Sequence, residues 1–582
     1  MSNADASEET IVSRIGGEWP TESDALAADG TEEITPLPEP RRRRFRPARV
    51  ALWVLVVVPV AVQFAEALRA PRLNFNDFWY VLGTSTSADG ALRPDKLFTL
   101  YQGQPAVLPT VVFWLDAKLF AGSNNVLGVC AVLLGIVLLA ALASMLPVRL
   151  TGTRRTAVLA GLALLVFSSA ATEYYGIGMM GTWWLLGLAC SGVALAFAHR
   201  GWTVPAVLFG VLASLSHGVG LVVWPALAVV AWLRAERLWR VVLPLVLGVA
   251  AFVGWSLLPQ PPEYPAPAIL GVDSYVGAML KSLGQIWSED SVDLAIIAGV
   301  VTAGVLVALL WPALRRAEPT DFEVDDRIDD AGWFGLAVQI LLAAVLIGVT
   351  RGRLGDTEPI APRYAGIALL AVCAVLVLLA VRGPDGLRAR IVPVALVLGI
   401  GAFGTGNAWA TVDRDRYPTQ PVLAVAMRVD AAPAITQLLA YPRFVPVLRA
   451  MHVYPFTSDF TLGCGGPELG TRIDLRAVKP LPLPGSGGTS GVVETGPVDG
   501  GVVIGGWAQI NGQAAGCVLV TDAAGTVVGG GAVGLPRADV SQKLGGTGRA
   551  GWQAVARPGL HDGVILVRAD GRYYRVASAP GK

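Results

Sequence analysis

An aspartate shortly after the first long apolar segment is the strongest candidate for acid–base chemistry in this chain. Asp77 lies in the run Asn76-Asp77-Phe78-Trp79-Tyr80. A carboxylate held above a membrane, at the mouth of an apolar cavity, can take a proton from an attacking hydroxyl group. A carboxylate at such a position can equally cap a helix or a loop and have no chemical role. The residues alone leave both interpretations open.

Three arginines about 280 positions further along the chain form the second candidate feature. Arg351, Arg353 and Arg363 flank two apolar segments. A guanidinium group pairs two phosphate oxygens at once, and does so best where water is partly excluded. We therefore predict a phosphate site. Salt bridges with Asp356 and Glu358, or anchoring at lipid headgroups, are the alternative interpretation.

Several polar and aromatic side chains in the predicted loops are candidates for contact with a substrate. They are Asn76, Trp79, Tyr80, Gln104, Glu173, Tyr174, His217 and Tyr364. Aromatic faces and carboxylates suit ligands rich in hydroxyl groups, but aromatic residues also anchor membrane proteins at the headgroup level. His217 lies between two short apolar segments, where it either binds substrate or is a hydrogen-bonded structural histidine.

Composition decides the class of protein that must position these residues. The chain has 582 residues, 53% of them hydrophobic and 15% charged, and a mean hydropathy of +0.56. Ordinary soluble domains have about 25% charged residues. The formal net charge of +1 excludes a partner held by bulk charge, such as nucleic acid. The sequence predicts a polytopic membrane protein in a lipid bilayer.

Apolar blocks predict about eleven transmembrane helices, since about 20 apolar residues span a bilayer. The blocks fall at 50–68, 126–146, 157–171, 182–198, 203–216, 219–234, 241–258, 291–312, 332–349, 365–381 and 391–408. Residues 50–408 form the predicted transmembrane domain, with an outer loop at 69–125. Within that loop we expect an amphipathic helix over Val107–Phe120 at the interface.

Arginine usage predicts the orientation in the membrane. Residues 1–49 begin as an acidic segment that we expect to be disordered, and end in a block of arginines against the first apolar run. Such a block holds the N-terminus in the cytoplasm. Lys and Arg in the short loops number about 19 on that side and about nine on the other. We expect a multi-pass protein of the plasma membrane whose C-terminal region is extracytoplasmic.

The C-terminal region changes character along its length. Residues 409–484 are mixed, with helical stretches, and 485–491 read as a Gly/Ser-rich linker. Short alternating apolar runs from 492 to 582, separated by turn signals, predict an all-β sandwich. Cys464 and Cys517 are the two cysteines of this outer compartment, where disulfides are permitted, and are candidates for a bridge.

The order of these features resembles the GT-C superfamily of membrane glycosyltransferases. The resemblance covers about residues 50–408: a first span, an outer loop with an early acidic residue, an amphipathic helix, Arg154-Arg155-Thr156-Ala157 opening a span, Leu215-Ser216-His217-Gly218, and Arg363-Tyr364 before a late span. The outer C-terminal region is similar to that of actinobacterial arabinosyl- and mannosyltransferases. Gly506-Trp507-Ala508, Arg537, Asp539 and Gly551-Trp552 look like β-sandwich modules of actinobacterial envelope proteins.

The resemblance implies a reaction. Such enzymes move a sugar from a polyprenyl-phosphate donor to an acceptor on the outer face, and their early acidic residue is the usual catalytic base. It implies that Asp77 is the base and that Arg351, Arg353 and Arg363 bind the donor phosphate. The acceptor would be a cell-envelope glycan, which the β-sandwich could also bind. No metal ligands are assigned, although a divalent metal is possible.

Two departures from the pattern keep other functions open. Many members of the superfamily have a second acidic residue where this chain has Asn76, and a His-Pro or Glu-His pair where it has Gln104-Pro105. A non-catalytic scaffold with this fold is therefore one alternative. A transporter or flippase of lipid-linked sugars is another, and would need polar groups deep within the spans.

Overall fold

The computed structural model describes residues 47–259, 271–288, 291–315, 321–351, 361–483, 488–495 and 498–578. Within these ranges it does not describe the side chains of Asn76, Arg315, residues 321–326 and Trp409. The predicted acidic tail as far as residue 46, Arg353, and linker residues 485–487 lie outside the described residues.

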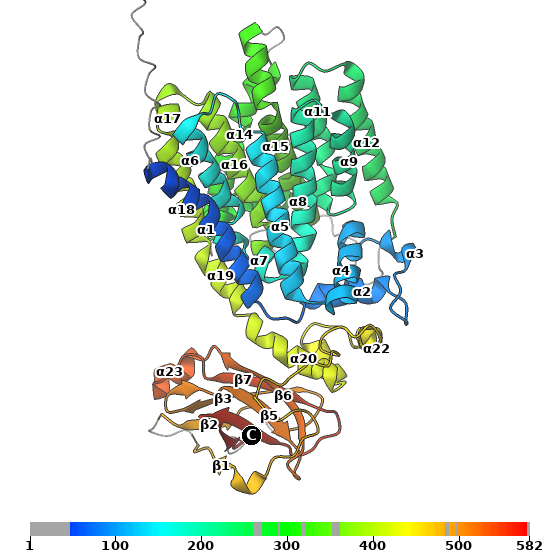
Figure 1. Ribbon diagram of the computed structural model, residues 1–582, viewed down its shortest axis with the longest axis vertical. Coiled ribbons are helices and arrows are strands. Elements are labelled where there is room, and N and C mark those ends of the chain that lie inside the picture. The colour runs from blue at the N-terminus through cyan, green and yellow to red at the C-terminus, as the bar shows by residue number, and fades with distance from the viewer. Residues whose placement is uncertain are drawn as a thin grey trace, which may run out of the picture. The chain divides into compact units, whose positions relative to one another are not determined.

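Long apolar helices dominate the first two thirds of the structure (Figure 1). Among the described residues, nine helical stretches are long and apolar enough to cross a membrane: Pro47–Arg69, Asn124–Ser144, Gly152–Gly176, Gly178–His199, Leu238–Ser256, Val292–Leu314, Arg327–Arg351, Pro362–Arg382 and Ile391–Arg428. Two shorter apolar helices, Thr203–Ser214 and Gly218–Leu233, coincide with the short predicted blocks at 203–216 and 219–234. The membrane class is confirmed, and eleven crossings remain a prediction.

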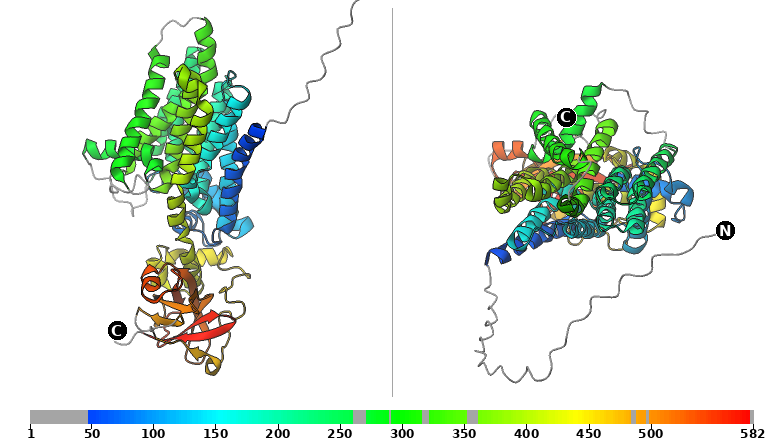
Figure 2. Two further views of the ribbon diagram at one scale, coloured as in Figure 1. Left: turned by 90° about the vertical axis from the view of Figure 1, so that its left-hand side faces the viewer. Right: turned by 90° about the horizontal axis from the view of Figure 1, so that it is seen from above.

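These helices pack side by side, as the end-on view in Figure 2 shows. Their bounds are α1 Pro47–Arg69, α5 Asn124–Ser144, α6 Gly152–Val166, α7 Thr172–Gly176, α8 Gly178–His199, α9 Thr203–Ser214, α10 Gly218–Leu221, α11 Val223–Leu233, α12 Leu238–Ser256, α13 Val272–Gly284, α14 Val292–Arg315, α15 Asp321–Arg351, α16 Ala365–Arg382, α17 Asp385–Ala389 and α18 Ile391–Thr405. The short helices η2 Ser169–Ala171, η3 Gln285–Trp287 and η6 Pro362–Tyr364 join them. α16 lies at the centre, because nearly all its side chains are buried.

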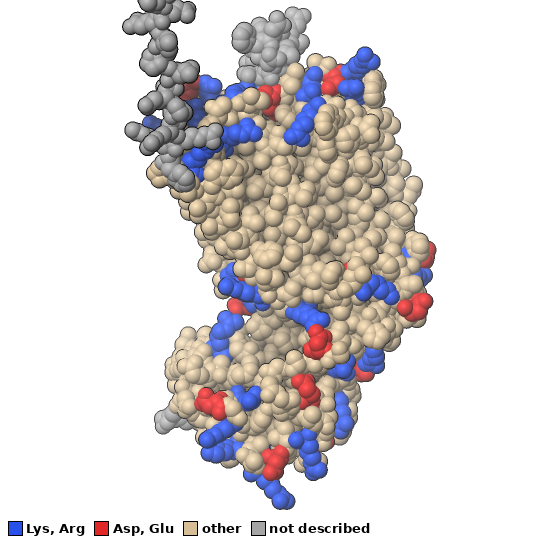
Figure 3. Space-filling model, viewed as in Figure 1, with Lys and Arg blue, Asp and Glu red and all other residues tan. Residues whose placement is uncertain are grey.

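Charged residues mark the two ends of the bundle. We call the end that carries α17 the α17 end, and the opposite one, which carries the first loop, the α2 end. On the face seen in Figure 3, a broad band almost without charged side chains separates the two. At the α17 end, fully buried Asp330 accepts hydrogen bonds from Arg149 at 2.5 Å and Arg382 at 2.6 Å. These pairs compensate the charge of a carboxylate that would otherwise be costly to bury.

The first loop folds into three helices at the α2 end: α2 Asn76–Ser85, α3 Pro94–Leu97 and α4 Val107–Phe120. α4 has the bounds expected for the interfacial helix. It ends where Ala121 and Gly122 adopt positive φ angles of 56° and 67°. Gly122 N donates to the carbonyl of Asp116 at 3.1 Å, which satisfies a carbonyl of the last turn.

After α18 the chain forms a series of short helices, several of which pack against the first loop. They are α19 Asn407–Arg414, η7 Tyr417–Thr419, α20 Gln420–Arg428, α21 Ala432–Gln437, η8 Pro442–Phe444, α22 Val445–Ala450 and η9 Leu475–Ala477. Apolar side chains of α20, α21, η8 and α22 share one core with Phe78, Trp79 and Phe113 of α2 and α4. Tyr454 N also donates to the carbonyl of Ala121 at 2.8 Å. The first loop is therefore shaped by residues more than 300 positions away.

The chain ends in a β domain built on one curled, mostly antiparallel sheet. The strands are β1 Lys479–Pro480, β2 Ser490–Val493, β3 Val503–Ile510, β4 Gln513–Ala514, β5 Cys517–Thr521, β6 Val527–Leu535, β7 Gly551–Ala556, β8 Val564–Ala569 and β9 Arg572–Val576, with helix α23 Ala538–Leu544 after β6. Their order is β1-β9-β8-β5-β6-β7-β3-β2, with β4 paired to β3. A bridge from Val493 to Ser578 brings the two sides of the sheet together.

The predicted all-β domain is confirmed in class but differs from the prediction in two respects. A single curled sheet replaces the two separate sheets of a sandwich. The sheet also begins before the predicted boundary at residue 492, because β1 pairs in parallel with β9. The alternation of apolar residues shows which side chains are buried, but not which strands pair.

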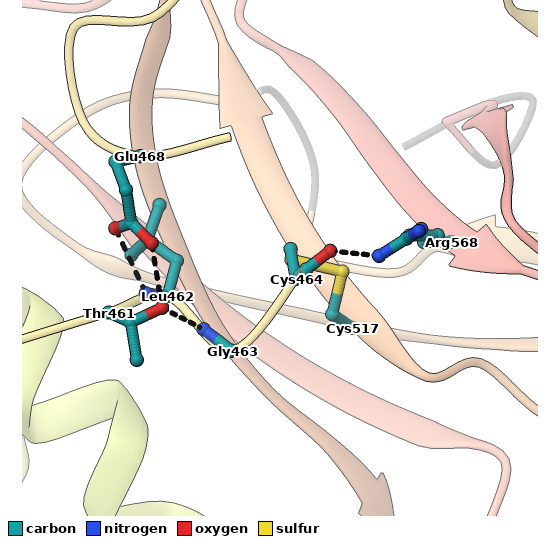
Figure 4. Close-up of a disulfide and its surroundings, with 7 residues drawn as sticks. All are labelled: Thr461, Leu462, Gly463, Cys464, Glu468, Cys517 and Arg568. Atoms are coloured by element: carbon teal, nitrogen blue, oxygen red, sulfur yellow. Dashed lines mark hydrogen bonds between the residues drawn. A yellow bond between two sulfur atoms is a disulfide. The ribbon is translucent and has the colours of Figure 1, made fainter. Parts of the chain in front are cut away.

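A disulfide joins Cys464 to Cys517 and ties the segment before β1 to β5 (Figure 4). The guanidinium group of Arg568 donates to the carbonyl oxygen of Cys464. On the same segment, the Glu468 carboxylate accepts from the Thr461 hydroxyl at 2.6 Å and from Leu462 N at 3.2 Å. The crosslink is thus embedded in a hydrogen-bonded loop that covers one face of the sheet.

Replacing Cys464 with Ser should lower the unfolding temperature of the β domain. The disulfide closes a loop between residues 53 positions apart, and its loss typically costs about 2–5 kcal/mol. Calorimetry of the purified full-length protein, with and without a reductant, measures the effect. The reductant should affect the wild type and a Cys130→Ser control alike. An unfolding temperature unchanged in Cys464→Ser would contradict this role.

Candidate functional site

Asp77 lies in the first turn of α2, where its neighbours in sequence fix the helix in place. Phe78 and Trp79 are fully buried in the core shared by α2, α4 and the helices that follow α18. The indole nitrogen of Trp79 donates to the carbonyl of Asn74 at 3.2 Å. Asp77 itself is half-buried. The aromatic run therefore anchors a helix whose first turn presents a carboxylate.

A tight turn faces this carboxylate. Tyr101 and Gln104 exchange backbone hydrogen bonds of 2.9 Å in both directions, and Gln102 and Gly103 have φ angles of 47° and 74°. Two successive positive φ angles define a type I′ turn, which favours glycine at its second central position. The turn directs the Tyr101 hydroxyl to the carboxylate of Asp77, with which it hydrogen-bonds.

Arg351 and Arg363 share the electrostatic environment of Asp77. α15 ends at Arg351, and the short helix η6 before α16 contains Arg363, so consecutive helices bring both to the α2 end. Burial raises the pKa of Asp77 above its usual range, and the Tyr101 hydrogen bond and the charges of Arg363 and Arg351 oppose that rise. Two of the three predicted phosphate ligands thus lie within electrostatic range of Asp77.

A cavity opens beside these groups. Four of the predicted site residues line it: Gln104, His217, Arg351 and Tyr364. Trp184, Thr350 and Trp255 complete its polar and aromatic wall. Residues of several helices line the cavity: α8, the start of α10, α12 and the end of α15. It therefore lies between helices of the bundle and is not formed by one loop alone.

Three polar atoms in this cavity wall are buried without a partner among the described residues. They are Nε of Arg351, the indole nitrogen of Trp255 and the side-chain oxygen of Gln104. Arg351 as a whole is only 9% exposed. Buried polar groups are nearly always hydrogen-bonded in stable structures. Two donors and one acceptor at the same cavity are therefore available to a bound ligand or to water.

His217 caps a helix and also lines the cavity. Its Nδ1 accepts a hydrogen bond from Val219 N at 3.2 Å at the start of α10, and its ring lies 4.0 Å from that of Trp184. Burial lowers the pKa of His217 to about 3, and the charge of Arg351 acts in the same direction. The imidazole is therefore neutral at neutral pH, with its proton on Nε2, where it can donate to a ligand.

Tyr174 and Tyr364 position Arg363. The Tyr174 hydroxyl donates to the carbonyl of Arg363 at 2.6 Å and accepts from Gly366 N at 3.3 Å. The buried ring of Tyr364 packs edge-on against Trp184 at 5.5 Å. The guanidinium group of Arg363 lies 5.7 Å from the Tyr364 ring. Tyr174 therefore holds the backbone around Arg363 in place and does not itself line the cavity.

Glu173 belongs to a neighbouring group of buried charges. It is 2% exposed and lies 3.6 Å from Arg416, which is also 3.5 Å from Asp413. Glu66, at the end of α1, pairs with Arg414 at 2.8 Å and accepts from the Tyr417 hydroxyl at 2.9 Å. These ion pairs join α1, α7 and α19 beside the cavity. The prediction from sequence did not include them, because their members are up to 350 residues apart.

The remaining predicted contacts lie away from the cavity wall. Trp79 is in the core, and Tyr80 packs 5.2 Å from Tyr101 and 5.2 Å from Tyr441. Tyr80 thus supports the residue that hydrogen-bonds Asp77. The side chain of Asn76 is not described, and Arg353 lies outside the described residues. Within the described ranges, no three His, Cys, Asp or Glu side chains converge as metal ligands would.

No protein-family model matches the chain, and no curated protein or solved structure is significantly similar to it.

Replacing Tyr101 with Phe should raise the pKa of Asp77 further, because the hydrogen bond that stabilises the charged carboxylate is lost. At a fixed pH near neutrality, the protonated fraction of Asp77 therefore increases. Infrared difference spectroscopy can follow its carboxylic C=O band, assigned with Asp77→Asn. Tyr454→Phe removes a hydroxyl group elsewhere in the same core and is the control. A titration that moves to lower pH in Tyr101→Phe would refute the arrangement.

Proposed function

We propose that this protein is an integral membrane glycosyltransferase. It transfers a sugar from a polyprenyl-phosphate donor to a cell-envelope glycan at the outer face, and inverts the anomeric centre. The observation that carries the proposal is that Asp77 lies within electrostatic range of Arg351 and Arg363, and that Arg351 lines a cavity in an apolar helical bundle. A carboxylate and guanidinium groups are the two functions that such a transfer needs, and they come from opposite halves of the chain.

In this proposal Asp77 is the general base. A sugar hydroxyl is a weak nucleophile at neutral pH, so a carboxylate within hydrogen-bond reach takes its proton as its oxygen attacks the anomeric carbon. The bond from that carbon to the phosphate oxygen breaks in the same displacement. A raised pKa strengthens Asp77 as a base, and the Tyr101 hydrogen bond and the two arginines oppose the rise.

Arg351 and Arg363 stabilise the leaving group. A polyprenyl phosphate leaves with its negative charge increased, and guanidinium groups in a partly dry site stabilise that charge as it develops. No general acid is needed, because phosphate leaves without a proton. Gln104 and neutral His217 add uncharged hydrogen-bonding groups to the same wall, which suit sugar hydroxyls.

The wider architecture is consistent with this assignment. In the proposed orientation the α17 end is cytoplasmic and the α2 end faces outward, so that a lipid-linked donor reaches the cavity from the bilayer. The β domain then lies outside the membrane, where a disulfide between Cys464 and Cys517 can persist. We assign it to the binding of envelope glycan.

A non-catalytic scaffold is the second candidate. The observation that favours it is Gln104, an uncharged side chain at the cavity where the resemblance leads us to expect a histidine or a glutamate. A flippase has weaker support: within the described spans, buried Gln339 of α15 has an unpartnered side-chain oxygen. The three functions differ in whether sugar is transferred, bound or moved across the membrane.

Replacing Asp77 with Asn should abolish transfer while donor binding is retained, because the amide cannot accept the proton. Membranes that contain each variant are supplied with polyprenyl-phosphate-linked sugars, and labelled acceptor is measured. Asp95→Asn is the matched control, since exposed Asp95 pairs with Arg93 in the same loop. Full transfer by Asp77→Asn rules out the base. Donor binding without transfer in the wild type supports the scaffold instead.

Replacing Arg363 with Ala should weaken binding of polyprenyl phosphate by about 2–5 kcal/mol, the usual cost of removing one member of a desolvated charge pair. Equilibrium binding to the purified protein measures the loss. Arg93→Ala removes an equal charge from the first loop at an exposed ion pair and should have little effect. Equal losses in the two variants would return Arg363 to a general anchoring role.

A further inference from the structure

A second cavity lies at the α17 end of the bundle, far from the candidate site. It lies among the end of α8, α9, α11 and the start of α12. Small apolar residues, among them Ala206, Ala231 and Pro244, form most of its wall. Glu236 and Arg240 provide its polar end. The cavity therefore has an apolar wall and charged residues at its opening, which we call its mouth.

Arginines surround this mouth and leave it positively charged. Glu236 is paired to Arg240 at 2.7 Å and to Arg234 at 3.5 Å. Arg200 and Arg237 lie on the adjoining turns and are exposed. Four arginines against one glutamate leave a net charge of +3 around the mouth. Nε of Arg240 is buried without a partner among the described residues.

Gly201 lets the charged groups approach the backbone closely. It adopts a φ of 77° in the turn between α8 and α9, and a Cβ there would lie 3.0 Å from a terminal nitrogen of Arg234 and 3.1 Å from Glu236. Arg234 also donates to the carbonyl of His199. The arginine is thus fixed at the mouth of the cavity, rather than extended into solvent.

The rim of the cavity has the composition of a membrane interface. Trp202, Trp232 and Trp239 are 57%, 44% and 53% exposed, and Val204 and Leu238 are 81% and 76% exposed. Exposed tryptophans beside arginines are typical of the headgroup level of a bilayer. α9 and α12 both begin here without a side-chain cap, so their first N–H groups add to the attraction for an anion.

We propose that this cavity binds the headgroup of an anionic phospholipid. The phosphodiester lies at Arg240 and Arg234, and the acyl chains follow the exposed apolar faces of α9 and α12. Basic pockets between transmembrane helices bind such headgroups through charge and hydrogen bonds together. A free phosphate ion would use the arginines but not the apolar wall or the exposed rim, which is why a lipid is the better occupant. The inference does not depend on the proposed enzymatic function.

To test this proposal, phosphatidylglycerol is titrated into the detergent-solubilised full-length protein, and bound lipid is measured by native mass spectrometry. Arg240→Gln removes a phosphate ligand, and Ala231→Leu fills the cavity without a change of charge. Each should weaken binding about tenfold. Arg154→Gln is the control: it removes one exposed arginine at the start of α6, on the same end of the bundle, and should bind lipid normally. Thermal unfolding verifies that each variant is folded, and because the two site variants differ in kind, either one that folds is informative.

Three results would overturn the proposal. An equal loss in Arg154→Gln would mean diffuse attraction to charge, and normal binding in Ala231→Leu would mean that the cavity is not used. Inorganic phosphate that displaces the lipid at millimolar concentration would identify a site for the free ion. Selective loss in the two site variants, with no such displacement, supports a built lipid site.

Discussion

The half-buried carboxylate of Asp77 is the constraint on which the architecture of the candidate site depends. Burial alone favours its protonated form, and a protonated aspartate cannot accept a proton. The Tyr101 hydroxyl and two guanidinium groups oppose that effect from three separate elements. The groups that oppose the rise in the pKa of Asp77 therefore come from parts of the chain that are distant in sequence.

The two ends of the bundle use arginine for different purposes. At the α17 end, Arg149 and Arg382 neutralise buried Asp330 and hold helices together. At the cavity of the α2 end, Arg351 has no carboxylate at ion-pair distance among the described residues and keeps an unpartnered Nε. An arginine side chain stabilises the fold where a carboxylate pairs with its charge. Where no carboxylate pairs with it, the arginine can bind a ligand.

The long helices could be predicted from the sequence, because apolar blocks of sufficient length have few alternatives to a bilayer span. The bounds of α4 could be predicted as well, and residue types singled out Asp77, Arg351 and Arg363 but did not show their proximity. The hydrogen bond from Tyr101 to Asp77 could not be predicted, since the direction of the Tyr101 side chain depends on a type I′ turn at Gln102-Gly103. The sandwich expected for the β domain became a curled sheet because alternation specifies faces, whereas pairing depends on contacts distant in sequence.

The shared core of the first loop and the helices after α18 has a consequence for how the protein is made. Phe78, Trp79 and Phe113 emerge early from the ribosome, yet the apolar side chains that cover them are encoded more than 300 residues later. Earlier residues such as Leu127, Met179 and Trp183 belong to the same core, but it remains incomplete until α20 to α22 have been synthesised. A product truncated before these helices would carry the long apolar helices together with an incomplete core beneath Asp77.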